Sequence, residues 1–73
     1  MEFKGRITEI IERDSAYHVK YKTDNGVNAF SLNKSELCGR FSEACMGKKV
    51  TVETDNHNVV KQVMVGWTTV LRR

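Results

Sequence analysis

Residues 16–33 read AYHVKYKTDNGVNAFSLN and carry the clearest structural signal in the chain. Two runs rich in β-branched and aromatic side chains flank the turn-forming sequence DNG at 24–26, which predicts an antiparallel hairpin. With residues 25–26 as a two-residue loop, Tyr21 lies opposite Phe30. This hairpin is the starting point for placing every other segment.

The predicted register separates the hairpin into an apolar face and a polar face, as a half-buried antiparallel sheet requires. The apolar face, which we expect to pack in the core, consists of Tyr17, Val19, Tyr21, Phe30 and Leu32. The polar face consists of His18, Lys20, Lys22, Ala29, Ser31 and Asn33. The hairpin therefore already indicates which side of the sheet meets solvent.

Residues 3–13 precede the hairpin and predict a long first strand, because apolar side chains recur at alternate positions. Ile10 stands beside Ile11 and breaks this period, which predicts a β-bulge or a strong bend near Glu9. Gly5 offers a second place where the strand can curve. The positions expected to face the core are Phe3, Ile7 and Ile11.

One helix is predicted over residues 34–46. Asn33 and Glu36 have the spacing of a capping box, and Gly47 supplies a stop signal. Gly39 inside this span costs about 1 kcal/mol relative to alanine, so a short or broken helix fits the pattern as well. The apolar side chains at helical spacing are Leu37, Phe41, Ala44 and Cys45.

The rest of the chain predicts a second hairpin and a terminal segment. Residues 48–54 alternate between apolar and polar side chains, and a polar turn separates them from a partner strand at 59–65. We divide the chain into one domain, 1–66, and a C-terminal segment, 67–73. This segment is expected to be either a tail or the piece that closes the sheet.

The order strand, strand, strand, helix, strand, strand resembles the five-stranded OB-fold, a small β-barrel, over residues 3–65. An SH3-like barrel with an inserted helix fits the same order. Closure into a barrel is favoured because an open sheet would leave long edge strands, and the chain has no proline to blunt them. The sequence therefore predicts a mainly β fold with one helix.

Length and charge narrow the possible functions. The chain has 73 residues and a formal net charge of +3, so we expect one small domain that can bind polyanions. No apolar stretch approaches the roughly 20 residues of a membrane span, and the N-terminus lacks a signal-peptide layout. We therefore expect a cytoplasmic protein with no membrane partner.

The cysteines and the known catalytic motifs point away from metal and enzyme chemistry. On the predicted helix, Cys38 and Cys45 would lie about 10 Å apart, too far for a disulfide. We expect free thiols that pack as small apolar residues, as in a reducing compartment. Because no Cys-x-x-Cys, P-loop, Gly-x-Ser-x-Gly or His-Glu-x-x-His motif is present, we expect no cofactor, no metal site and no enzyme activity.

The polar faces of the first three strands are expected to merge into one basic outer surface, with Glu12 as its only acid. Barrels of the OB type commonly take oligonucleotides on this face, and its charge suits a phosphate backbone. We predict binding to nucleic acid, to single strands rather than duplexes, with little sequence preference. The alternative is that the lysines only keep an exposed face soluble. The candidate residues are Lys4, Arg6, His18, Lys20, Lys22, Ser31 and Asn33.

A second hypothesis is a protein-interaction module, an accessory or inhibitory factor of the kind that phages and mobile elements encode. Trp67 is the only aromatic residue without an expected place in the core, and tryptophan and arginine are enriched at interface hot spots. The C-terminal segment would then dock a partner protein or join two copies of the chain. Its candidate residues are Trp67, Val70, Leu71, Arg72 and Arg73.

Overall fold

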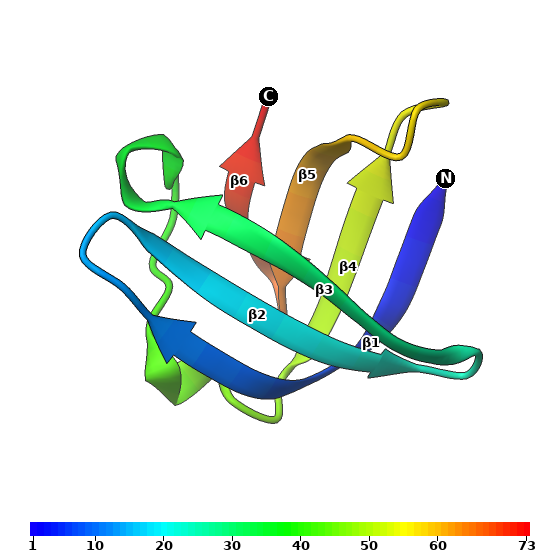
Figure 1. Ribbon diagram of the computed structural model, residues 1–73, viewed down its shortest axis with the longest axis horizontal. Helices are drawn as coiled ribbons and strands as arrows, with labels where there is room; N and C mark the ends of the chain where they lie inside the picture. Colours follow the sequence, from blue (N-terminus) through cyan, green and yellow to red (C-terminus); the bar gives the residue numbers. More distant parts are fainter.

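A computed structural model describes all 73 residues and shows six antiparallel strands in one unclosed sheet (Figure 1). The strands are β1 (Glu2–Glu12), β2 (Ala16–Thr23), β3 (Gly26–Asn33), β4 (Lys49–Thr54), β5 (Val60–Val65) and β6 (Thr68–Arg72). Their order across the sheet is β3-β2-β1-β4-β5-β6. The only helical elements are two 3-10 turns between β3 and β4, η1 (Lys34–Glu36) and η2 (Glu43–Cys45). Neither is long enough to span a bilayer.

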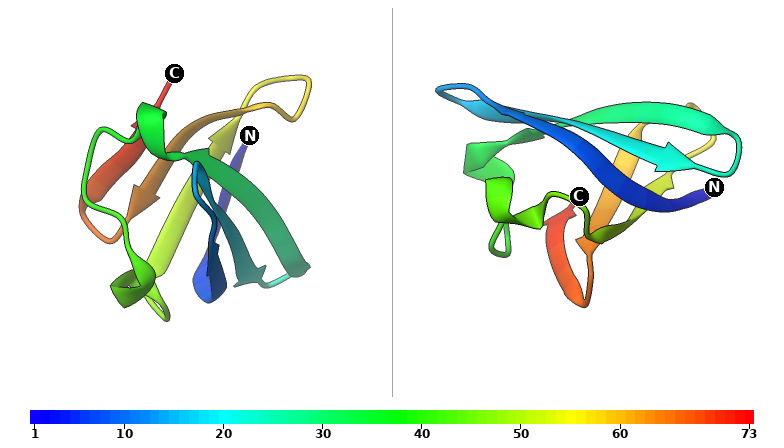
Figure 2. Two further views of the ribbon diagram at one scale, coloured as in Figure 1. Left: turned by 60° about the vertical axis from the view of Figure 1, so that its left-hand side comes forward. Right: turned by 90° about the horizontal axis from the view of Figure 1, so that it is seen from below.

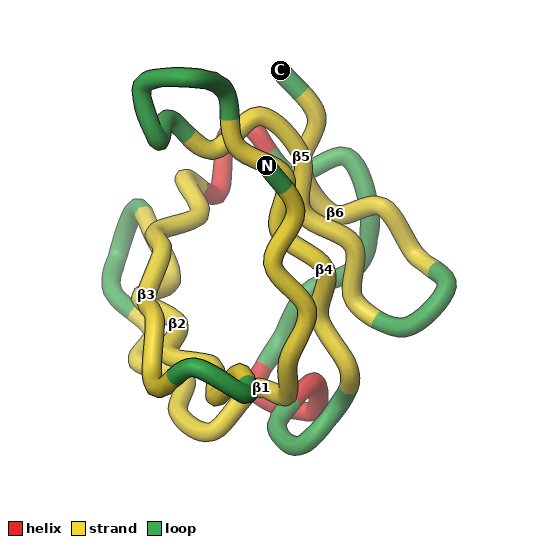
Figure 3. Tube along the Cα trace, turned by 90° about the vertical axis from the view of Figure 1, so that its right-hand side faces the viewer, coloured by secondary structure: helices red, strands yellow, loops and turns green.

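Strand β1 belongs to both halves of the sheet. It pairs with β4 up to Arg6 and with β2 from Arg6 onward. Just before this junction, Gly5 lies so close to the Lys22 carbonyl that a Cβ at this position would collide with it. Figure 2 shows the β1–β3 side of the sheet lying across the β4–β6 side, and Figure 3 shows the two sides facing one interior. The bend in β1 thus folds one sheet over its own core.

The β2–β3 hairpin is confirmed, but its loop lies one residue earlier than predicted. Thr23 pairs with Gly26, so residues 24–25 form the loop. The Thr23 hydroxyl accepts the Asn25 N–H at 3.2 Å and donates to the Gly26 carbonyl at 3.1 Å, which stabilises this turn. The pairing of the two strands is therefore offset by two residues from the prediction.

This offset leaves both faces of the hairpin as predicted, because side chains alternate with a period of two. Tyr21 lies opposite Asn28 rather than Phe30. The Tyr21 and Phe30 rings are still neighbours, with centroids 5.6 Å apart. The five residues of the predicted apolar face are all buried: Tyr17, Val19, Tyr21, Phe30 and Leu32.

The β-bulge in β1 is confirmed, since the register with β2 shifts between Ile7 and Glu9. Beyond the bulge the two faces of the strand exchange, so Ile10 is buried and Ile11 is 39% exposed. The prediction that Ile11 faces the core is wrong, because it continued the alternation through the bulge. Glu9 moves to the outer face, where it lies opposite Lys20.

The predicted helix over residues 34–46 is wrong. Between η1 and η2 the chain is extended: Leu37 forms a β-bridge with Leu71, and the Cys38 N–H donates to a β6 carbonyl at 3.0 Å. Gly39 then packs directly against the β6 backbone. Pairing with a strand that is distant in sequence thus overrides the local helical pattern. Residues 34–45 are termed the connecting segment below.

The signals that predicted the helix have other roles in the structure. The Asn33 amide donates to the Glu36 carboxylate at 2.7 Å but does not cap η1. Phe41 and Cys45 are buried as expected, because the connecting segment covers one end of the core. Cys38 is exposed, so its expected place on a buried helical face is wrong; both cysteines are free thiols.

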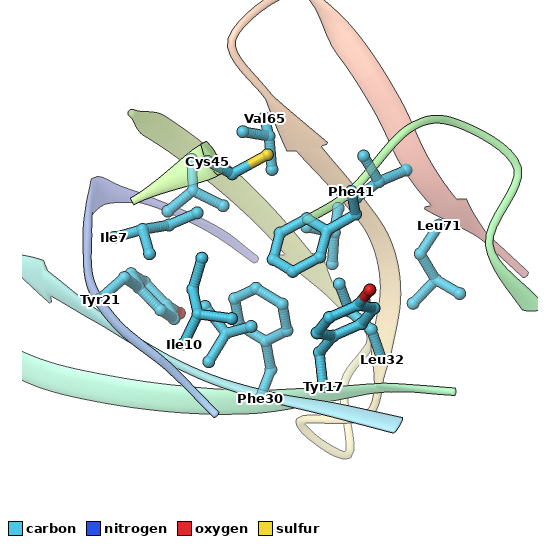
Figure 4. Close-up of a cluster of buried hydrophobic side chains, with 14 of the residues drawn as sticks. Ile7, Ile10, Tyr17, Tyr21, Phe30, Leu32, Phe41, Cys45, Val65 and Leu71 are labelled. Atoms are coloured by element: carbon cyan, nitrogen blue, oxygen red, sulfur yellow. The ribbon is translucent and has the colours of Figure 1, made fainter. Parts of the chain in front are cut away.

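The second hairpin is confirmed as β4 and β5, and a sixth strand follows it. Strand β6 pairs with β5, so the expectation of five strands is wrong. The sheet ends at β3 and β6 without closing, and an OB-like or SH3-like barrel is not established. Figure 4 shows the core, in which side chains from β1, β2, β3, β5, β6 and the connecting segment point toward one another.

Candidate functional site

Three cations stand side by side on the outer face of the sheet. Arg6 of β1 pairs with Lys22 of β2 on one side and with Lys49 of β4 on the other. All three side chains are exposed. Like charges placed directly opposite one another destabilise a sheet, so this arrangement costs the fold stability. These three residues are termed the cationic row.

The cationic row lies in a groove of about 600 Å³ between the end of β2, the bend of β1 and the start of β4. Lys4 adds a fourth positive charge, and Asp24 is the only acidic residue of the lining. The remaining polar groups are threonine hydroxyls, from Thr8, Thr23 and Thr51. Thr8 and Thr23 already donate to the carbonyls of Lys20 and Gly26, so the groove offers a ligand mainly the N–H groups of its positively charged side chains, which suit an anion.

The ion pairs of the protein leave the cationic row free. Of the five ion pairs, none includes Arg6, Lys22 or Lys49. The Arg6 guanidinium donates to the Gly47 carbonyl at 3.1 Å, which orients it without neutralising its charge. Lys4 is paired with Glu2 at 3.5 Å. The row is thus the unneutralised part of the groove.

The other predicted nucleic-acid residues lie outside the groove and have partners within the protein. Lys20 forms an ion pair with Glu9 at 3.5 Å, because the bulge brings that acid to the outer face. The His18 ring Nδ1 lies 2.9 Å from the Ser31 hydroxyl. Asn33 bonds to Glu36. The seven candidates are therefore divided: Lys4, Arg6 and Lys22 share the groove, whereas His18, Lys20, Ser31 and Asn33 do not.

Sequence reasoning missed Lys49 and misplaced Glu12. Lys49 precedes the buried Val50 and so faces outward, but its place beside Arg6 depends on the β1–β4 pairing, which no local pattern reveals. Glu12 lies beyond the bulge and pairs with Lys34 at 2.7 Å, and this hydrogen bond raises the pKa of Lys34. The expectation of Glu12 as the only acid on the outer face is wrong, since Glu9 lies there.

The turn between β5 and β6 holds the most exposed large apolar side chain of the protein. Trp67 is 99% exposed. The preceding Gly66 donates its N–H to the Lys49 carbonyl at 2.8 Å. This turn is therefore at the same level of the sheet as the cationic row, on the strand that follows β4 in the sheet order. Trp67 is therefore in a turn that is bonded to β4 at Lys49, although its side chain does not line the groove.

The rest of the C-terminal segment contributes less surface than the sequence suggested. Val70 and Leu71 are fully buried, so they belong to the core and cannot contact a partner. Arg73 forms an ion pair with Glu36 at 3.1 Å, and this interaction is the main cause of the lowered pKa of that carboxyl. Of the five candidate partner-binding residues, Trp67 and Arg72 remain exposed without an ion pair.

Comparison with protein families, with curated proteins and with solved structures found no match to this chain. Its function is therefore inferred from charge, exposure and geometry.

Proposed function

We propose that the protein binds nucleic acid through the phosphate backbone, with the cationic row at the centre of the contact surface. The observation that carries this proposal is that Lys22, Arg6 and Lys49 are adjacent, exposed and without an acidic partner. A bound phosphate replaces their mutual repulsion with charge-assisted hydrogen bonds. Because such contacts do not read base edges, we expect little sequence preference.

The exposed tryptophan supports a single strand rather than a duplex as the ligand. Unpaired bases can stack on an aromatic ring, and each stacked base contributes about 1–3 kcal/mol. Trp67 is free to accept a base while the neighbouring groove holds the backbone, because the β5–β6 turn is bonded to Lys49. The resemblance of the strand order to oligonucleotide-binding barrels forms part of this proposal.

The same tryptophan favours a second candidate function, a protein-interaction module. Tryptophan and arginine are enriched at interface hot spots, and Trp67 and Arg72 are exposed at the two ends of β6. In that case Trp67 and Arg72 would contact the partner, and the cationic row would contribute only long-range attraction. The two functions place the essential side chains at different positions, so substitutions distinguish them.

The test is fluorescence anisotropy with labelled oligothymidine and with duplex DNA over a series of salt concentrations. We expect Lys22→Glu with Lys49→Glu to weaken oligothymidine binding at least tenfold and to lower the slope of log K against log salt by about 1 to 1.5. The matched control is Arg13→Glu with Arg40→Glu, which changes the net charge equally at two exposed arginines without ion pairs. Its loss of affinity is expected to be much smaller.

Two outcomes would contradict nucleic-acid binding at this site. One is equal loss of affinity in both double variants, since net charge alone would then explain binding. The other is the absence of binding by the wild-type protein at low salt, which would leave the protein-interaction module. Trp67→Ala adds a further readout: it is expected to weaken single-strand binding about 5- to 150-fold and to have little effect on duplex binding.

A further inference from the structure

Strand β3 is an open edge of the sheet with none of the features that normally discourage pairing. It is eight residues long, is bonded only to β2, and contains no charged residue and no proline. Its register with β2 has no bulge. Native proteins usually protect such edges with charge, proline, bulges or short length. An outward-facing Val27, 62% exposed, adds apolar surface to this edge.

The hydrogen bonds show which backbone groups of β3 are free. The Lys34 N–H donates to the Ser15 carbonyl at 2.9 Å, so the neighbouring facing residues Ala16 and Asn33 are a pair without hydrogen bonds to each other. Hydrogen-bonded and non-hydrogen-bonded pairs then alternate along the rest of the hairpin. The even-numbered residues of β3 therefore bond to β2. The N–H and C=O groups of the odd-numbered residues point away from the sheet and have no partner in the protein: Val27, Ala29 and Ser31.

The opposite edge of the sheet is protected. Strand β6 is five residues long, and Arg72 lies near its end. The connecting segment covers part of it, because Leu37 bridges Leu71 and the Cys38 N–H bonds to the Val70 carbonyl. The protein thus blocks one edge and leaves the other available, which marks β3 as a surface for pairing.

We propose that β3 pairs with β3 of a second copy of this chain, antiparallel, about a two-fold axis through Ala29. In this register Ala29 lies opposite its own counterpart, and Val27 lies opposite Ser31 of the other copy. All the outward backbone groups of Val27, Ala29 and Ser31 are then bonded in both copies. The interface is isologous, and the two sheets become one continuous sheet.

Charge favours a second copy as the occupant of this edge. Because β3 carries no charge, self-pairing places no like charges opposite each other. The nearest lysines lie on β2, and the two β2 strands are separated by three strand spacings, about 14 Å, which exceeds the Debye length of about 10 Å at 0.1 M ionic strength. One of these lysines, Lys20, is already paired with Glu9. This inference does not depend on nucleic-acid binding.

The test is the molar mass of the full chain by analytical ultracentrifugation over a range of concentrations. The wild-type protein is expected to reach twice the chain mass of 8.4 kDa. Ala29→Lys and Ala29→Glu are each expected to stay monomeric, because the two-fold axis brings identical charges together. An equimolar mixture of the two variants is expected to recover the dimer. Thr68→Lys, at the exposed start of the opposite edge, is the matched control and is expected to dimerise.

Amide hydrogen exchange of the wild-type protein gives a readout that does not depend on any variant. We expect the N–H groups of Val27, Ala29 and Ser31 to become protected as concentration rises, while that of Trp67 does not. A wild-type protein that stays monomeric up to its solubility limit would overturn the proposal. A dimer that persists in Ala29→Lys, or a mixture no heavier than either variant alone, would also overturn it.

Discussion

Single residues show where this small fold loses stability. Thr54 is buried, and its hydroxyl is the one buried side-chain polar atom without a hydrogen-bond partner. Leaving such a group unsatisfied costs about 1–3 kcal/mol, because water is lost and nothing replaces it. Valine has nearly the same shape and carries no polar atom. The site therefore offers a clean comparison between a buried hydroxyl and a buried methyl group.

We predict that Thr54→Val raises the free energy of unfolding by about 1 kcal/mol, measured by urea denaturation. Thr54→Ser is the control, since it keeps the hydroxyl, removes a buried methyl group and should lower the stability. Equal destabilisation by both substitutions would show that the Thr54 hydroxyl has a partner after all.

At the scale of elements, the connecting segment closes one end of the core despite having little regular structure. Its main contribution is Phe41, which is buried and meets the Tyr17 ring edge-on at a centroid distance of 5.0 Å. A large aromatic side chain in such a position is a major source of stability for a domain of this size. The segment is therefore part of the fold and not a loose loop.

We predict that Phe41→Ala lowers the free energy of unfolding by about 3–5 kcal/mol, which is most of the stability expected for a small domain. The neighbouring Arg40→Ala removes an exposed side chain and should change stability by less than about 0.5 kcal/mol. Thermal denaturation followed by circular dichroism compares the two. Similar melting temperatures for both variants would mean that the segment does not pack on the core.

The sequence could predict those elements that are determined by residues close together in the chain, and it could not predict those that depend on contacts distant in sequence. The β2–β3 hairpin and the bulge in β1 depend on neighbouring residues, and both were found. The two-residue offset of the hairpin was not predicted, because Asn25-Gly26 is itself a favoured two-residue loop, whereas the observed loop at 24–25 is stabilised by the Thr23 hydroxyl. The absence of the helix depends on bonds from Leu37 and Cys38 to a strand about thirty residues later, which periodicity cannot reveal.

The candidate site follows the same rule. The sequence predicts that Arg6 and Lys22 lie on the same outer surface, because the first strand and the hairpin are adjacent in sequence and in space. Lys49 was not predicted there, because the return of β4 to the far side of β1 is a property of the whole sheet. Lys20 was predicted as a contact, but its pairing with Glu9 depends on the position of the bulge. Charge composition alone could not separate paired from unpaired lysines.

For the whole molecule, two carboxylates link stability to acid pH. Hydrogen bonds from Arg73 and then Asn33 lower the pKa of Glu36 below its usual 4.5. Backbone N–H groups, that of Val59 first, lower the pKa of Asp55 below its usual 3.8. A lowered folded-state pKa gives stability that is present above the unfolded-state pKa and is lost as the pH falls through the folded-state value.

Two other groups act in the opposite direction at alkaline pH. The hydrogen bond to Glu12 raises the pKa of Lys34, and burial raises the pKa of Tyr21. The contribution of these two raised pKa values to the stability of the fold is fully present below the unfolded-state pKa of each group, and it is lost as the pH rises through the folded-state pKa. We predict from urea denaturation a plateau of stability between about pH 5 and pH 9, with a decline on each side. Glu36→Gln should make the loss of stability at acid pH shallower. An unchanged loss of stability at acid pH would show that Glu36 does not contribute to it.

The central claim is that the cationic row forms the contact surface for nucleic acid, and an NMR titration of the isotope-labelled chain with oligothymidine tests it most directly. We predict that the largest shifts occur at the backbone amides of Arg6, Lys22 and Lys49 and at the indole N–H of Trp67, and that they fade as salt is added. Shifts confined to other parts of the sheet, or none at low salt, would contradict the account.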